Sequence, residues 1–190
     1  MIENWVYEEL KKDIGLERYN HSILVMETCV DLAKFYNHPI GEAKLAGLLH
    51  DCGKFQDKTK ILKTIDEFDI ILDNIMKKNM ALAHGLLGEF IAEQKYNIHS
   101  KDVLNAIRYH TTARENMSLL EKIVFIADLI EPSRKFPGVE KMRKLAYENL
   151  NKSIIFALDN NIQFVVERNN LLHLDTIKAR NYLLILEDME

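Results

Sequence analysis

Apolar side chains recur along most of the chain at the three- and four-residue spacing of amphipathic helices. In residues 18–36, for example, Ile23, Met26, Val30 and Ala33 share one helical face. The alternation of apolar and polar residues that marks half-buried strands is missing from the sequence, as are internal repeats and low-complexity stretches. This pattern predicts an all-α protein.

The pattern predicts a single irregular bundle of about eight to ten helices. The expected helical segments are 3–12, 18–36, 40–50, 59–78, 84–96, 100–110, 118–132, 139–150, 151–168 and 176–187. Residues 59–78 are less regular than the others, and two short helices are an alternative to one there. No linker-like composition divides the chain, so we expect one domain over residues 1–190.

Several helix ends carry capping signals. Ser118 and Glu121 form a capping box at the start of 118–132. Gly53 is expected to end the helix of residues 40–50 in the usual C-terminal manner. Asp175 or Thr176 is the expected N-cap of the last helix.

The composition agrees with a helical fold. Of 190 residues, 47% are hydrophobic, and only 7 are glycine and 3 proline, which is few for a many-turned β protein. The formal net charge is −4, the charges are well mixed, and no segment carries a basic stripe. We therefore expect no nucleic-acid partner.

Other features indicate a cytoplasmic protein that does not bind membranes. The two cysteines, Cys29 and Cys52, do not make a disulfide framework, and we expect both to be buried hydrophobes rather than nucleophiles. The N-terminal segment is unlike a signal peptide, and no apolar run approaches the ~20 residues that span a bilayer. The number of subunits stays open, with a homodimer as one alternative.

Four polar residues lie in unusually apolar surroundings. His21 precedes an apolar helical face, His50 and Asp51 end the run "AKLAGLLH", and Asp128 lies inside "KIVFIADLIE". Each alone has an ordinary structural explanation, such as a hydrogen-bonded core histidine or an aspartate paired with arginine. Together, two imidazoles and two carboxylates are a ligand set for a divalent transition metal. We favour the metal site.

Two further histidines extend this set. His84 begins a predicted helix and His110 ends another, and both have small or apolar neighbours. A helix-end hydrogen bond explains each as well as a functional role does. If all six residues converge, they have room for two metals bridged by Asp51, or for one metal with two histidines facing the substrate.

The remaining histidines fit the site less well. His38 precedes a proline in a surface turn, and His99 lies in a polar connection, so both are expected to be structural. His173 lies in a loop beside the last helix. We lean against metal binding for His173 but keep it as a candidate substrate contact.

The motifs around these residues resemble the HD superfamily of metal-dependent phosphohydrolases, whose signature is His…His-Asp…Asp on helices. Similarity to its YqeK group covers residues 15–185 and is most specific in "RYHTTAR" and "ADLIEPSRKFPGVE". That group is assigned symmetrical hydrolysis of diadenosine tetraphosphate to two ADP, with iron as the expected metal. Cys52 departs from the larger residue that is common in the group. The Gly-Tyr-Pro motif of the cyclic-dinucleotide branch is absent from the sequence, which disfavours that branch.

The resemblance implies a helical fold of the HD type and a site for one or two metal ions. It matches the metal ligands to His21, His50, Asp51 and Asp128, and the additional histidines, which hold a second metal or contact phosphate, to His84 and His110. Iron is the first expectation for the metal, with Mn, Co, Ni and Zn as alternatives that a His and carboxylate set also accepts.

The implied chemistry is attack of a metal-activated water on a phosphoanhydride phosphorus. A bound divalent metal lowers the pKa of water towards ~7. Asp51 or Asp128 would then hold or deprotonate the nucleophile, and the sequence does not decide which. Because ADP is a good leaving group, the reaction does not require a dedicated general acid.

Basic and hydroxyl groups near the ligands are candidates for binding phosphate. Lys54 follows Asp51 by three residues, and Arg134 lies in the loop after Asp128. Next to a metal site, a phosphate contact is the favoured role for both. Arg18 is three residues before His21, where a phosphate contact and a solvated surface position are about equally favoured. Thr111 could donate its hydroxyl to phosphate, as could Thr112.

Three alternatives stay open at this point. The nearest keeps the metal and changes the substrate to a mononucleotide, a deoxynucleoside triphosphate or a cyclic nucleotide. A second is a di-iron oxygenase, which the phosphate-binding candidates disfavour. A third is a non-catalytic nucleotide sensor, which the intact ligand set disfavours.

Overall fold

A computed structural model describes residues 2–55 and 57–189 of the chain. Within these residues the chain forms eleven α-helices, one 3-10 helix and no strand. The all-α prediction is therefore confirmed, with one helix more than the expected range. None of the described helices is long and apolar enough to cross a membrane. The helices are α1 (Asn4–Ile14), α2 (Leu16–Phe35), α3 (Ile40–Leu49), α4 (Lys58–Glu67), α5 (Asn74–Lys78), η1 (Met80–Leu82), α6 (His84–Gln94), α7 (Lys101–Tyr109), α8 (Leu119–Ile130), α9 (Val139–Ala146), α10 (Leu150–Glu167) and α11 (Leu174–Asp188).

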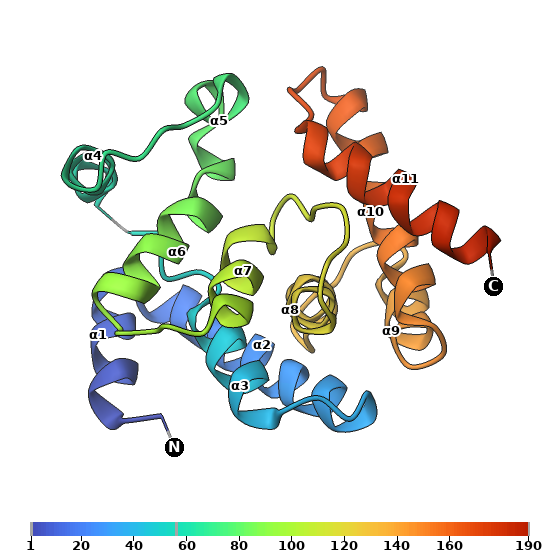
Figure 1. Cartoon of the computed structure of the whole chain (residues 1–190), viewed down its shortest axis with the longest axis horizontal. Coiled ribbons are helices and arrows are strands. Elements are labelled where there is room, and N and C mark those ends of the chain that lie inside the picture. The colour runs from blue at the N-terminus through green and yellow to red at the C-terminus, as the bar shows by residue number, and fades with distance from the viewer. Residues whose placement is uncertain (1, 56, 190) are drawn as a thin grey trace.

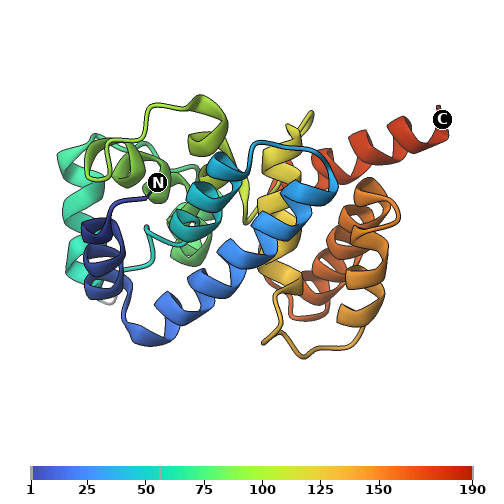
Figure 2. The same ribbon diagram turned by 90° about the horizontal axis from the view of Figure 1, so that it is seen from below.

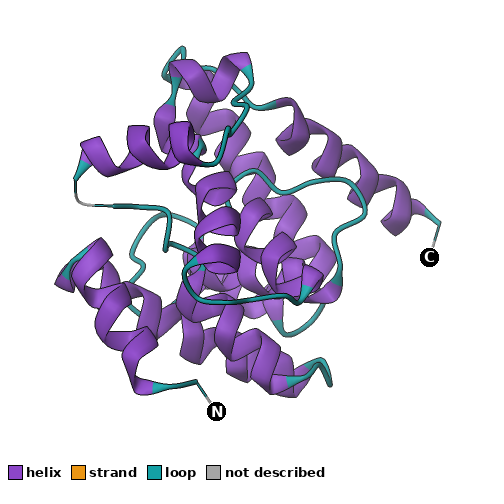
Figure 3. Ribbon diagram, turned by 60° about the vertical axis from the view of Figure 1, so that its left-hand side comes forward, coloured by secondary structure: helices purple, strands orange, loops and turns teal. Residues whose placement is uncertain are grey.

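Helix α8 stands in the middle of the molecule. It packs against α2, α3 and α7 on one side and against α9 and α10 on the other. Figure 1 looks almost along its axis, and Figure 2 shows it between the N-terminal helices and the α9–α11 group. Figure 3 shows that the described residues form only helices and the loops that join them. The central position explains why α8 is apolar on nearly all sides.

The capping box predicted at the start of α8 is only half formed. The Ser118 hydroxyl accepts a hydrogen bond from the Glu121 backbone N–H, as expected. The Glu121 carboxylate does not return to Ser118, because it is buried in a bidentate ion pair with Arg114 at 2.6 and 2.7 Å. The tertiary ion pair therefore replaces the local contact.

The prediction for Gly53 is wrong in its mechanism. Among the described glycines, only Gly15 and Gly138 have a positive φ, so no left-handed conformation requires glycine at position 53. A Cβ there would instead lie 2.2 Å from the His84 carbonyl oxygen and 2.7 Å from the Gly88 nitrogen. Glycine at this position allows the turn after α3 to touch the backbone of α6.

The N-cap of the last helix also differs from the prediction. His173, rather than Asp175 or Thr176, caps α11, and its Nδ1 accepts a hydrogen bond from the Asp175 N–H at 3.2 Å. The His173 Nε2 bonds the Asp73 carboxylate at 2.7 Å, and Asp73 in turn caps α5. This pair of caps ties α11 to the segment between α4 and α6. Of the two alternatives for residues 59–78, the structure has two short helices, α4 and α5.

The contact at Gly53 predicts a strong sensitivity to one added methyl group. Gly53→Ala should lower the free energy of unfolding by about 3 kcal/mol, because two backbone segments must separate. Gly41→Ala is the matched control, since its Cβ would meet nothing within 4 Å. That variant should be neutral or more stable by up to about 1 kcal/mol. Urea unfolding of both variants measures the difference, and equal stabilities would contradict the close approach.

Candidate metal centre

Six predicted residues, which lie in or next to five helices, meet on the side of α8 that faces α2, α3 and α7. His21 lies in α2 and Asp128 in α8, whereas the other four lie at helix ends. Their candidate ligand atoms form three overlapping groups, and within each group all atoms lie within 4.8 Å of one another. The groups are His21, His50 and Asp51; His50, His110 and Asp128; and Asp51, His84 and His110.

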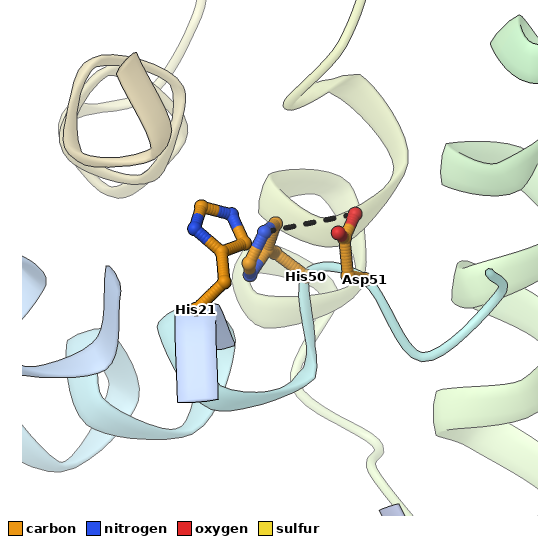
Figure 4. Close-up of side chains that lie close together, drawn as sticks. All are labelled: His21, His50 and Asp51. Carbon is orange, nitrogen blue, oxygen red and sulfur yellow. Dashed lines mark ion pairs between the residues drawn. The ribbon is translucent and has the colours of Figure 1, made fainter. Parts of the chain in front are cut away.

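The first part of the centre joins α2, α3 and α8. The His21 Nε2 lies 2.9 Å from the Asp128 Oδ1. The His50 Nε2 lies 3.6 Å from the Asp51 Oδ1 and 3.9 Å from the Asp128 Oδ1. Figure 4 shows the His21 and His50 rings side by side, with the His50–Asp51 ion pair as a dashed line. His50 thus lies beside both carboxylates, and His21 lies beside Asp128.

The second part of the centre contains the additional histidines. The His84 and His110 Nε2 atoms lie 2.9 Å apart, and each is 3.4 Å from the Asp51 Oδ1. The Thr111 hydroxyl oxygen lies 3.0 and 3.2 Å from the two nitrogens. Asp51 therefore faces both parts of the centre, the position that a bridging carboxylate requires.

Three of the four histidines are oriented by their own backbone. Each lies just past or at the start of a helix and directs its Nδ1 to the carbonyl oxygen three residues earlier. These Nδ1–O distances are 2.8 Å for His50 to Gly47, 2.5 Å for His84 to Ala81 and 2.6 Å for His110 to Ile107. A carbonyl oxygen only accepts, so each Nδ1 carries a proton, and in the neutral tautomer the Nε2 is left as an acceptor.

Bare acceptors that face one another need a cation between them. The His84 and His110 Nε2 atoms have no shared proton in this tautomer, although they are 2.9 Å apart. The His50 Nε2 and the Asp51 Oδ1 are buried and have no hydrogen bond of good geometry among the described residues. Leaving such atoms buried and unsatisfied is costly. These donor atoms, at this spacing, fit a divalent transition metal.

Glu131 is a site residue that the sequence prediction missed. Its carboxylate is fully buried and lies 3.2 Å from the Nδ1 of His21, the one histidine without a backbone anchor. Ser133 holds the carboxylate with its N–H at 2.6 Å and its hydroxyl at 2.5 Å. A carboxylate behind a ligating imidazole fixes the ring and its tautomer. The signal in the sequence was a second acid, three residues after Asp128 at the end of an apolar helix.

The predicted phosphate contacts lie at the edge of this centre. The Lys54 Nζ is 3.0 Å from the Asp51 Oδ1, and the Arg134 Nη2 is 2.5 Å from the Asp128 Oδ1. Arg18 donates to the Lys54 carbonyl oxygen at 3.4 Å. Lys54 and Arg134 thus lie against the centre and offset the charge of the two carboxylates, whereas Arg18 lies next to Lys54.

The protonation states of the centre suit metal binding. Burial lowers the pKa of His50 to about 4, against the charges of Asp51 and Asp128. Burial alone would raise the pKa of Asp51, but the surrounding histidines and the Lys54 ammonium outweigh it and hold that pKa well below its usual range. The pKa of Asp128 is lowered as well, mainly because the hydrogen bond from His21 outweighs burial. At neutral pH both carboxylates are ionised and His50 is a free base.

Two other predicted features lie apart from this cluster. His173 pairs with Asp73 and caps α11, and it belongs to none of the three ligand groups. Cys29 and Cys52 are fully buried, and burial raises the pKa of both thiols. A thiol with a raised pKa is a poor nucleophile, which agrees with the expected structural role.

Comparison with known proteins places the chain in a family. Residues 18–133 match the HD domain family. A symmetrical bis(5'-nucleosyl)-tetraphosphatase of Halalkalibacterium halodurans is 43% identical over 93% of this chain and 94% of the relative. The Bacillus subtilis protein of the same name is 34% identical over 92% of this chain and 93% of its own.

A solved structure is similar over almost its whole length. The crystal structure of a predicted HD superfamily hydrolase involved in NAD metabolism, from Clostridium acetobutylicum, is 45% identical and superposes with a TM-score of 0.92. The match covers 96% of this chain and 97% of that one. The chain therefore belongs to the HD domain family, and within it to the group of these two curated relatives.

Proposed function

We propose that this protein hydrolyses diadenosine tetraphosphate and related dinucleoside polyphosphates symmetrically, giving two ADP from the tetraphosphate. The observation that carries the proposal is the convergence of six ligand residues around Asp51, with Lys54 and Arg134 beside the two carboxylates. The two curated relatives carry this activity in their names. Polyphosphate hydrolysis needs both a metal centre and cations for phosphate charge.

The residues divide into two ligand sets. His21, His50, Asp51 and Asp128 would hold one metal ion, as the resemblance implies. Asp51, His84 and His110, whose ligand atoms lie within 4.8 Å of one another, would hold a second. A bound divalent cation would lower the pKa of a water molecule and polarise a phosphoryl oxygen. Following the resemblance to the YqeK group, we propose iron among the metals that this set accepts.

The chain's own groups supply proton handling and charge. Asp51 and Asp128 are ionised at neutral pH, so either carboxylate can accept a hydrogen bond from an attacking water and orient it. Arg134 suits bidentate contact with phosphate, and Lys54 acts as a compact point charge. Thr111 lies against the second ligand set and can donate its hydroxyl to a phosphate oxygen. ADP leaves readily, so no additional acid is assigned.

Product identification tests the proposed reaction directly. Protein purified without added metal should contain a transition metal, and the reaction with diadenosine tetraphosphate should give ADP as the only nucleotide product. Reaction in water labelled with oxygen-18 should place the label on one of the two ADP molecules. Metal analysis measures the bound metal, chromatography identifies the nucleotide products, and mass spectrometry locates the label. A mixture of AMP and ATP would contradict symmetrical cleavage.

Replacing the shared carboxylate should remove both metal and activity. Asp51→Ala should lower kcat by at least about 100-fold and reduce the bound metal, because Asp51 faces both ligand sets. Asp31→Ala is the control, since that carboxylate is exposed and pairs with the exposed Lys34. Elemental analysis and initial rates compare the two variants. Full metal content and full activity in Asp51→Ala would rule out the proposed centre.

Glu131 should act as a positioning residue rather than as a ligand. Glu131→Gln keeps the shape but weakens the acceptor behind His21, so metal affinity should fall by about 10- to 100-fold. At saturating metal, much of the lost rate should return. Glu27→Gln is the control, because Glu27 is exposed on α2, the helix that carries His21. Metal titration of activity gives both values, and an unchanged metal affinity would refute the role.

A further inference from the structure

A large cavity opens beside the second ligand set. It measures about 610 Å³, within the usual range of ligand pockets. Two of its lining residues, Lys54 and His84, also contact the Asp51 carboxylate, at 3.0 and 3.4 Å. The cavity therefore begins at the candidate metal centre itself, and a ligand bound there can extend into it without a gap.

The character of the cavity changes with distance from the centre. Arg18 and Lys54 are the described cationic residues of its lining. The rest of the described lining is mostly apolar and comes from the segment after α3, from α4, from η1 and from α6: Phe55, Ile61, Leu62, Met80, Ala81 and Leu87. One end thus suits phosphate, and the other suits a flat, weakly hydrated ring.

Two apolar side chains of this lining are exposed to water. Leu62 is 62% exposed and Met80 is 36% exposed. They lie on α4 and η1, which approach the cavity from different parts of the chain. Apolar surface gathered around a concave site marks a binding site more often than chance exposure does. A ligand with an apolar face would cover both side chains.

We propose that this cavity, which we call the α4 pocket, holds one nucleoside of the dinucleoside polyphosphate, with Phe55 as its stacking surface. The inference rests on the proposed function and assigns the end of the substrate for which the sequence offers no motif. The polyphosphate of the substrate would run from the metal centre past Lys54 and Arg18 into the pocket. The base then packs against Phe55 and the apolar residues of α4 and η1.

The same pocket should bind the product. Each half of a symmetrically cleaved substrate is ADP, which has two phosphates for the centre and one nucleoside for the α4 pocket. ADP should therefore inhibit competitively. Inorganic pyrophosphate has the same phosphates without the nucleoside, so it separates contacts at the centre from contacts in the pocket.

The test compares these two inhibitors in the metal-loaded enzyme. Phe55→Ala should raise the Ki of ADP and the KM of diadenosine tetraphosphate about tenfold, since stacking is lost. The Ki of pyrophosphate should change less than twofold. Phe164→Ala removes an aromatic ring that is 51% exposed on α10 and should change none of these constants. Leu62→Ala, at a more exposed position that tolerates change, should raise the ADP Ki about threefold.

Each outcome decides the assignment. A rise in the ADP Ki alone supports the α4 pocket. Equal rises in the Ki of ADP and the Ki of pyrophosphate would overturn it. An ADP Ki that is unchanged in both Phe55→Ala and Leu62→Ala would overturn it as well. If the wild-type enzyme fails to cleave diadenosine tetraphosphate, the proposed function fails instead. In that case direct titration with ADP and pyrophosphate still decides whether the pocket binds a nucleoside.

Discussion

The hydrogen bond from an imidazole Nδ1 to a nearby backbone carbonyl is the contact on which this site depends. It occurs at His50, His84 and His110, in each case at a helix boundary. The bond fixes the tautomer, so that a lone pair points inward from each ring. All three rings are buried, which limits the access of bulk water to these lone pairs. The fold thus gathers acceptor atoms in one buried place, and a cation balances their partial negative charge better than the neighbouring side chains do.

The apolar helices are the supports that this arrangement requires. Asp128 projects from α8, which is central and packed on both sides, so its position is fixed by the core rather than by a flexible loop. His50 and Asp51 follow directly from α3, whose last turns are buried. Rigid supports lower the conformational entropy that is lost when the ligands gather around a metal. The free energy of folding therefore offsets the cost of holding like-charged carboxylates close together.

The sequence identified candidate site residues where a polar side chain interrupts an otherwise apolar helix. An aspartate inside an apolar helix and a His-Asp pair at the end of another stand out without any structure. The pattern left His84 and His110 balanced between a structural and a functional role, and only the family resemblance matched them to the site, where they now lie beside Asp51. Glu131 did not stand out, because an acid at a helix end is ordinary and its role depends on a contact across 110 residues of chain. The Gly53 contact and the His173–Asp73 pair are likewise tertiary. Periodicity describes single helices, whereas these features arise between helices.

Charge balance links metal binding to substrate binding. The chain has a formal net charge of −4 and the centre contains two ionised carboxylates, so a polyphosphate approaching the bare site would meet repulsion. Lys54 and Arg134 already lie against those carboxylates and neutralise them rather than leaving a positive surplus. A divalent cation held by the carboxylates would supply that surplus and leave the two basic side chains available to phosphate. A metal in this centre would therefore serve substrate affinity as well as chemistry.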